Sequence, residues 1–315
     1  MVTGARGFLG AAVLAAFVAE GRACEGWVRA GPVADGAPLR AVGDLADAPG
    51  HALEAALAGA SAVVHLAGRA HVPPAGADAL LERDNVVATV RLAQAARAAG
   101  VPRFVHVSSV KVNGDATLPG HPFHVGDAPA PADAYARSKW RGEQALWSAL
   151  AGGPPRLAVL RIPMTYGPGA RGNFAALVHA VRHGWPLPLG ALRNRRHLLG
   201  LPNLVGALDA ALDAPSAIVG TYFVADAEAV STPHLVRAIA AALGRPARIV
   251  DVPLAWLQLG GRLLGRTAAV ERLSGSLEVD TRPYEAASGW RPAPFRLDAL
   301  AVSTVPGESS RAAPT

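Results

Sequence analysis

The sequence predicts an α/β fold, a doubly wound parallel sheet followed by a smaller C-terminal lobe. Apolar strand-like segments alternate with helix-like segments through the first half of the chain, as in a parallel sheet covered on both faces. A glycine-rich turn over residues 4–10 opens the first helix, as in sheets that bind dinucleotides. With 315 residues, 51% of them hydrophobic, the chain can bury a large core and an attached lobe. This combination is typical of the Rossmann type of fold.

The predicted elements follow one another in a regular order. Helices are predicted over residues 8–20, 51–59, 78–99 and 134–151. Short apolar runs predict strands over 24–30, 61–68, 101–109 and 157–163, with a further segment ending at 43–45. Beyond about residue 166 the pattern loosens into helices, proline-rich turns and short strands such as 220–225.

Three regions follow from this order. Residues 1–165 are predicted to form the Rossmann domain, to which segments near 201–228 return. Residues 166–302 are predicted to form mainly a substrate-binding lobe. Residues 303–315 have the composition of a linker, and we expect them to be disordered.

Composition excludes several classes of protein. The 30 basic residues give a net charge of +6 but are scattered, whereas a nucleic-acid binder concentrates them on one face. No apolar run reaches the roughly 20 residues that a membrane span needs. A single cysteine, Cys24, allows no internal disulfide and fits a reducing compartment, so we expect a cytoplasmic protein. No metal-ligand set is predicted.

The glycine turn allows two interpretations. Residues 8–18 are nearly all apolar and follow Arg6, which also fits a secretion leader. Gly4, Gly7 and Gly10 instead allow a tight turn whose N–H groups approach a pyrophosphate at a helix N-terminus. The regular order of strands and helices downstream favours the second interpretation.

A tyrosine and a lysine carry the predicted chemistry. Tyr135 and Lys139 are four residues apart, which places them on one face of a helix. A nearby ammonium favours the phenolate and brings the tyrosine pKa toward neutrality. Lys139 is one of only two lysines, with Lys111, in a chain that otherwise uses arginine. Upstream, a predicted strand ends at Ser109, which supplies a hydroxyl at the carboxyl edge of the sheet.

These motifs together resemble the extended short-chain dehydrogenase/reductases, the NAD-dependent epimerase/dehydratase family. The resemblance covers about residues 1–300. A narrower resemblance is to a UDP-glucose 4-epimerase-like subgroup that includes UDP-4-keto-6-deoxy-N-acetylglucosamine 4-reductases of surface polysaccharide biosynthesis. The motifs that carry the family resemblance are Gly4-Ala-Arg-Gly-Phe-Leu-Gly10, Gly43-Asp-Leu45, His65-Leu-Ala-Gly68, Asn85, Ser108-Ser109 and Tyr135-x-x-x-Lys139. The motifs that carry the narrower resemblance are Ser108-Ser-Val-Lys-Val-Asn-Gly114, Arg161-Ile-Pro-Met-Thr-Tyr-Gly-Pro-Gly169, Gly172-Asn-Phe174, Leu187-Pro-Leu-Gly190, Asn194-Arg-Arg196 and Gly275-Ser-Leu-Glu-Val-Asp280.

The resemblance implies a role for individual residues. Tyr135 would be the acid/base at the sugar oxygen, Ser109 would hydrogen-bond that oxygen, and Lys139 would lower the tyrosine pKa and bind the nicotinamide ribose. The implied cofactor-binding residues are Gly4, Arg6, Gly7, Phe8, Leu9, Gly10, Arg29, Asp44, Leu45, Leu66, Ala67, Gly68, Tyr135 and Lys139. The implied substrate-binding residues are Ser109, Lys111, Asn173 and Arg196. The family also implies a homodimer that pairs through the helix carrying Tyr135.

The chain departs from the family in three places. Only residues 1–3 precede the glycine turn, so we expect the natural start to lie upstream. Arg29 stands where NAD-specific members carry an acidic residue, which favours NADP over NAD. Gly200 and Asn203 replace the family's usual His and Asp.

The remaining question is the reaction. The family's dehydratases carry Asp-Glu after the catalytic Ser/Thr, whereas this chain has Val110 and Lys111, so dehydration is disfavoured. A 4-ketoreductase acting on a UDP-4-keto-6-deoxy-N-acetylhexosamine is favoured, and a UDP-hexose or UDP-N-acetylhexosamine 4-epimerase is the alternative. A non-catalytic NAD(P)-binding sensor or scaffold is the alternative from another class.

Overall fold

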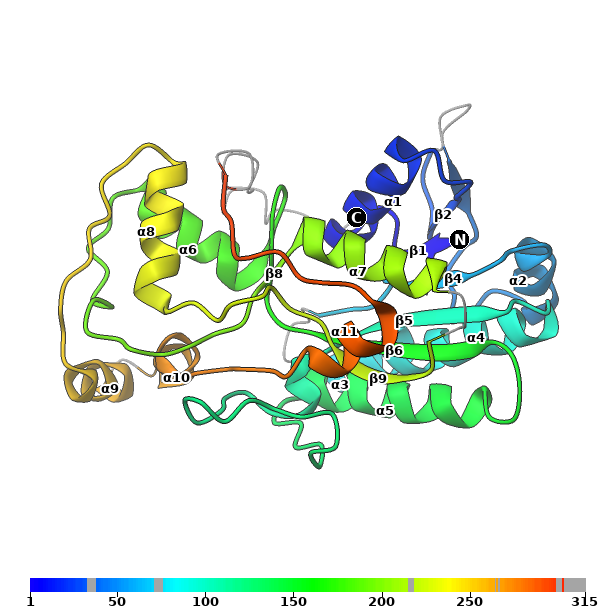
Figure 1. The fold of residues 1–315 in the computed structure, drawn as a ribbon. Helices are drawn as coiled ribbons and strands as arrows, with labels where there is room; N and C mark the ends of the chain where they lie inside the picture. Colours follow the sequence, from blue (N-terminus) through cyan, green and yellow to red (C-terminus); the bar gives the residue numbers. More distant parts are fainter. Residues whose placement is uncertain are drawn as a thin grey trace.

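A computed structural model of the chain describes residues 1–32, 38–70, 76–214, 218–263, 265, 267–298 and 302. In this described part, seven strands form one sheet in the order β3-β2-β1-β4-β5-β6-β9 (Figure 1). Every neighbouring pair is parallel. The strand order reverses between β1 and β4, which is where ligands bind in open parallel sheets. The strands are β1 Val2–Thr3, β2 Gly26–Val28, β3 Leu39–Ala41, β4 Val63–His65, β5 Arg103–Ser109, β6 Arg156–Ile162 and β9 Gly220–Phe223.

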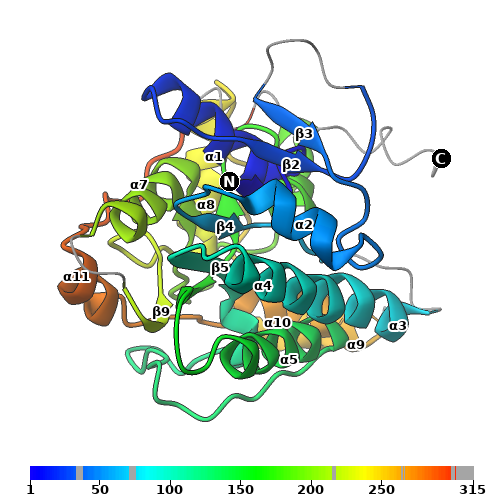
Figure 2. The same cartoon turned by 90° about the vertical axis from the view of Figure 1, so that its right-hand side faces the viewer.

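Helices cover both faces of this sheet (Figure 2). In β5, Phe104 packs into one apolar cluster, whereas Val105 and Val107 pack into the cluster on the opposite face. Alternate side chains of a strand point to opposite faces, so a nearly continuous apolar run is buried on both sides. The predicted fold class is confirmed. One face carries α1 Phe8–Ala19, α7 Leu201–Asp213 and α11 Arg282–Ser288, and the other carries α2 Gly50–Leu57, α4 Ala88–Ala98 and α5 Ala134–Ala149.

The helix predicted over 78–99 contains a π-helical turn. It consists of α3 Ala77–Glu82, the π-turn η1 Arg83–Val87, and then α4. In a π-turn the hydrogen bond spans one residue more than in an α-helix, which re-aims the side chains that follow. Here the turn buries Asp84 and Asn85.

Beyond β6 the chain builds a lobe beside the sheet. A small parallel pair joins β7 Thr165–Tyr166 to β8 Leu199–Gly200. Phe174, Val178 and Ile239 are fully buried in the apolar core of the lobe. Its helices are α6 Gly172–Arg182, α8 Thr232–Ala242, α9 Leu254–Leu263 and α10 Thr267–Ser274.

Two predictions from composition concern the chain as a whole. Among the described residues, no helix is both long and apolar enough to cross a membrane. The tail predicted to be disordered, 303–315, lies outside the described residues.

Candidate active site

The glycine turn brings backbone segments into unusually close contact. Gly4 has a φ of +69°, and a Cβ there would lie 2.9 Å from the backbone nitrogen of Ala67. A Cβ at Gly10 would lie 2.1 Å from the carbonyl oxygen of Gly4. Gly7 precedes α1, and no described side chain caps its first turn. N–H groups at the start of a helix are available to an anion, and pyrophosphate binding at this turn stays a prediction.

A cleft of about 520 Å³ opens beside this turn. It is bounded by the glycine turn and by the segments that follow β2, β3 and β4. Phe8, Leu9 and Gly10, in the first turn of α1, do not line it, and neither do Tyr135 and Lys139. The predicted cofactor residues that line the cleft are Gly4, Arg6, Gly7, Arg29, Asp44, Leu45, Leu66, Ala67 and Gly68.

Acidic and basic side chains form ion pairs at the cleft. Arg29 Nε lies 3.2 Å from the Asp44 carboxylate, and its Nη2 lies 3.5 Å from that of Asp84. Arg69 Nε lies 2.6 Å from Asp84, and Arg83 Nη1 lies 3.0 Å from Asp44. Burial opposes ionisation of Asp44, but the N–H of residue 46 and the two arginines hold its pKa below the usual value. Sequence reasoning missed Asp84 and Arg69, because the π-turn that presents Asp84 leaves no clear trace in the apolar pattern.

Ser109 and Tyr135 meet at the carboxyl end of β5. Ser109 ends β5, and its Oγ accepts a hydrogen bond of 3.3 Å from the N–H of Lys111 in the short 3-10 turn Val110–Val112. Asp133 caps α5 by accepting from the N–H of Ala136 at 2.7 Å, and it also pairs with the Lys111 ammonium. The cap therefore fixes the start of α5, where Tyr135 is hydrogen-bonded to Ser109.

The ionisation of Tyr135 differs from the sequence-based expectation. Burial raises the pKa of Tyr135 to about 12, and its hydrogen bond with Ser109 only partly offsets this. The sequence predicts that Lys139 lowers the pKa of Tyr135, but in this structure burial has the larger effect. At neutral pH the phenol therefore holds its proton, as a general acid must.

Lys139 lies one turn further along α5 and is 5% exposed. Its ammonium donates to the carbonyl oxygen of Val107 at 2.9 Å and faces Nε2 of His106 at 3.2 Å. Burial lowers the pKa of Lys139 to about 8, although the carboxylate of Glu143 favours the charged form.

A buried ion pair supports this helix from behind. Glu143 is fully buried and accepts from Ser108 Oγ and, at 2.6 Å, from Arg161 Nη2. Arg161 also donates to Asn113 Oδ1 at 2.8 Å. These contacts join β5, β6 and α5 directly behind Ser109. The sequence analysis missed Glu143. Its position four residues after Lys139, on the same helix face, is the sequence feature that could have identified it.

Asn85 links the cleft to α5. Its Oδ1 accepts from the N–H of Arg69 at 2.7 Å, and its Nδ2 donates to Ser138 Oγ at 2.9 Å. Ser138 in turn donates to the carbonyl oxygen of Tyr135 at 2.8 Å. The rim of the cleft and the helix of Tyr135 are thereby held in one hydrogen-bonded network.

The predicted substrate residues are more dispersed. Lys111 is paired with Asp133 and, at 3.2 Å, with Asp115. Asn173 lies in the first turn of α6, and Arg196 donates to the carbonyl oxygen of Gly275 at 2.7 Å. Burial lowers the pKa of Arg196, which still leaves a guanidinium charged.

Tyr166 and Asn203 serve packing in this structure. The Tyr166 hydroxyl donates to Asp226 at 2.7 Å, and Asn203 Nδ2 donates to the same carboxylate at 2.7 Å. Asp226 is fully buried and also accepts from the N–H of Gly200. This chain departs from the family at Gly200 and Asn203. Both residues donate to the buried Asp226 carboxylate, so in this structure they stabilise the fold.

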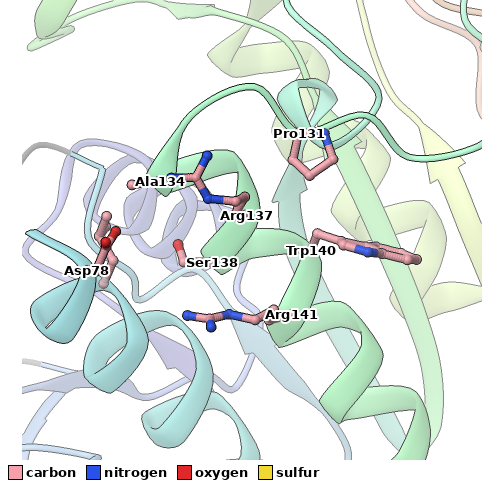
Figure 3. A pocket seen from close by; sticks show the side chains of 8 residues that line it. Asp78, Pro131, Ala134, Arg137, Ser138, Trp140 and Arg141 are labelled. Atoms are coloured by element: carbon pink, nitrogen blue, oxygen red, sulfur yellow. The ribbon is translucent and has the colours of Figure 1, made fainter.

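A second cavity of about 360 Å³ lies between α3 and α5 (Figure 3). Arg137, Ser138 and Arg141 approach it from α5, and Asp78 approaches it from α3. The sequence did not predict this cavity.

A glycine-turn cleft beside a Ser–Tyr–Lys set at the edge of a parallel sheet defines a dinucleotide-dependent enzyme of the short-chain dehydrogenase type. A model of the "NAD dependent epimerase/dehydratase family" matches residues 1–225, and the chain belongs to that family. The family resemblance found in the sequence is confirmed.

Individual relatives agree with this assignment. A UDP-glucose 4-epimerase of Vibrio cholerae is 36% identical over 243 residues, covering 76% of this chain and 74% of the relative. The structure of MoeE5 in complex with UDP-glucose and NAD is 26% identical, with a TM-score of 0.74 and coverage of 96% of this chain and 95% of MoeE5. A short-chain dehydrogenase/reductase superfamily protein from Agrobacterium tumefaciens with bound NAD is 25% identical, with a TM-score of 0.73 and coverage of 96% and 94%.

Proposed function

We propose that this protein is an NAD-dependent UDP-sugar 4-epimerase. The observation that carries the proposal is the hydrogen-bonded pair Ser109–Tyr135, one helical turn from the buried Lys139 and beside the dinucleotide cleft. The 36% identity to a UDP-glucose 4-epimerase supports the substrate class. A bound nicotinamide supplies reversible hydride transfer at a carbinol carbon.

In this proposal the chain's own residues handle the proton. Tyr135 exchanges a proton with the oxygen on the reacting sugar carbon, and Ser109 donates a hydrogen bond to that oxygen or to the phenolate. Lys139 stabilises the phenolate when the proton has left, because its ammonium stays on the same helix face. Arg196 and Asn173, on the lobe, are proposed to bind the nucleotide diphosphate and sugar.

The residues of the cleft fit NAD. Gly4 and Gly10 admit no side chain because other backbone lies against them, which keeps the turn tight beside the cleft, as a pyrophosphate-binding turn requires. The charge of Arg29 is shared with Asp44 and Asp84. Two carboxylates at this position oppose a 2′-phosphate, so we propose NAD in place of the NADP that Arg29 alone predicted.

A 4-ketoreductase is the second candidate. Arg29 favours it, because its side chain is 58% exposed and can turn toward a phosphate despite its acidic neighbours. Lys111 at the position of a dehydratase carboxylate argues against dehydration in either case. The intact Ser–Tyr–Lys set argues against a sensor without catalysis. We also propose that the protein forms a homodimer that pairs through α5, and that it acts in the reducing cytoplasm.

One pair of assays separates these candidates. The purified protein is incubated with UDP-glucose or UDP-N-acetylglucosamine and NAD, and C4 epimers are separated by chromatography. In parallel, NADPH consumption is followed with UDP-4-keto-6-deoxy-N-acetylglucosamine. Interconversion of epimers without net cofactor consumption supports the epimerase, and stoichiometric NADPH oxidation supports the reductase. Inactivity in both assays, with NAD still bound, supports the sensor.

A further inference from the structure

Two histidines lie stacked in the centre of the sheet. His65 in β4 and His106 in β5 are register partners, and their ring centroids are 5.2 Å apart. Both side chains are fully buried. His65 has the structural position that its strand predicts, whereas the sequence assigned no role to His106.

The hydrogen bonds of His65 are complete. Thr3 Oγ1 accepts the backbone N–H groups of residues 66 and 67, each at 3.1 Å, so its own hydrogen is directed to His65 Nδ1 at 2.8 Å. His65 therefore carries its hydrogen on Nε2 and donates it to Thr89 Oγ1 at 2.9 Å. Both ring nitrogens of His65 are therefore hydrogen-bonded, as is usual for a buried histidine that serves the fold.

His106 is different because only one of its nitrogens is paired. Its Nε2 faces the Lys139 ammonium at 3.2 Å, and an ammonium can only donate. Burial, together with the charge of Lys139, holds the pKa of His106 well below its usual value, so the ring is neutral. Its hydrogen then sits on Nδ1, which is buried without a hydrogen-bond partner among the described residues. An unpaired buried N–H destabilises a fold, so stability does not explain this histidine.

Lys139 gains a fixed direction from this arrangement. Of its three ammonium hydrogens, one is taken by Val107 O and one by His106 Nε2, both on the sheet side. Gly68, which lines the cleft, is also close to this ammonium, because a Cβ built at Gly68 would be 4.0 Å from Nζ. No other described residue accepts the third hydrogen, so a ligand in the neighbouring cleft can accept it.

We propose that His106 is a positioning residue that holds the Lys139 ammonium against the sheet and leaves one of its hydrogens directed at the cofactor cleft. This rests on the role proposed for Lys139. The titratable groups that act on this pair are His65 from β4 and Glu143 from α5. Glu143 is already paired with Arg161, so the ammonium is held by two neutral acceptors, His106 Nε2 and Val107 O.

Two variants separate positioning from ordinary packing. His106→Phe keeps a flat ring beside His65 but removes the acceptor, and His106→Gln keeps an acceptor at the position of Nε2. Because the chain contains only Lys111 and Lys139, a protein labelled with 15N-lysine gives just two side-chain signals, and Lys139 can be titrated directly.

We expect the Phe variant to lower the pKa of Lys139 from about 8, because the charged form loses a hydrogen bond. Its kcat/KM should fall about tenfold at pH 7.5, less than the roughly 10²–10⁴ that a general acid–base group contributes, because Lys139 itself is retained. Its Tm at pH 9 should equal or exceed that of the parent protein, since the unpaired Nδ1 is gone. The Gln variant should retain the Lys139 titration of the parent and most of its activity.

An unchanged Lys139 titration in the Phe variant overturns the proposal, as does a Tm that falls at every pH, which indicates simple packing. Failure of the wild-type protein to convert any UDP-sugar instead contradicts the proposed function. In that case the lysine titration and the Tm still decide the role of His106, because neither depends on turnover.

Discussion

Tyr135 is the residue on which the proposed chemistry depends, because its phenol is hydrogen-bonded to Ser109 at the carboxyl edge of β5. Tyr135→Phe keeps the ring and removes only the hydroxyl. We expect kcat for epimerisation to fall by about 10²–10⁴, the usual contribution of a general acid–base group. NAD affinity, measured by calorimetry, should stay within a few-fold.

Tyr166→Phe is the matched control, since that hydroxyl bonds the buried Asp226. It should lower the free energy of unfolding by about 1–3 kcal/mol without a comparable loss of kcat. Equal losses of kcat in the two variants would contradict the assignment of Tyr135.

The role proposed for Lys139 predicts that the reaction is sensitive to alkaline pH. Burial lowers its pKa to about 8, so the side chain is charged below that pH and neutral above it. Because the charged form is proposed to stabilise the phenolate of Tyr135, kcat/KM should decline as pH rises through about 8. Lys139→Arg should be slower overall but show no such decline, since a guanidinium stays charged. Identical pH profiles for the two proteins would argue that another group controls the alkaline limb.

Single residues differ in how far the sequence could predict them. Tyr135 and Lys139 were predictable because a four-residue spacing on one helix is a local property. Asp84 and His106 were not, because their partners depend on which strands and turns become neighbours. Asp84 meets Arg29 only through the π-turn, and His106 meets Lys139 only because α5 packs on β5.

The helix α5 is held as an element by the buried pair Glu143–Arg161. Removing one partner leaves a buried charge uncompensated, so Glu143→Leu should destabilise the protein by about 3–5 kcal/mol in urea unfolding. The double variant Glu143→Leu/Arg161→Met removes both charges and should recover most of that loss. A double variant no more stable than the single one would indicate that the contacts to Ser108 and Asn113, rather than the charge, determine stability here.

Element boundaries were predictable where an apolar run ends at a turn residue, as for α5 and β5. The π-turn Arg83–Val87 was not, because an extra residue within a long helical run leaves the apolar spacing on either side almost unchanged. The prediction of a strand over 220–225 was correct, and segments near 201–228 were predicted to return to the Rossmann domain, but periodicity could not show that β9 pairs with β6.

At the scale of the whole molecule, alternation of strands and helices predicted the sheet and the glycine turn predicted the cleft. The charge balance inside the cleft could not be predicted in the same way. Arg29 follows β2, Asp44 follows β3 and Asp84 lies in η1, so their contact is a product of the assembled fold.

That charge balance leads to a prediction about the cofactor. A ligand at 100 times its dissociation constant stabilises the folded state by about 2.7 kcal/mol, so the cofactor that binds more tightly gives the larger rise in Tm at equal concentration. Because Asp44 and Asp84 already share the charge of Arg29, we expect NAD to raise the Tm more than NADP does.

Arg29→Ala sharpens this test, because it exposes both carboxylates to a 2′-phosphate. The variant should lose its remaining response to NADP and keep most of its response to NAD. Arg40→Ala is the matched control, since Arg40 contacts only Glu25, at 3.9 Å, among the described ion pairs and does not line the cleft. A larger Tm rise with NADP than with NAD would mean that Arg29 leaves its acidic neighbours to bind the phosphate. The 4-ketoreductase would then be favoured over the epimerase, since net reduction rather than internal return of hydride is the reaction that consumes NADPH.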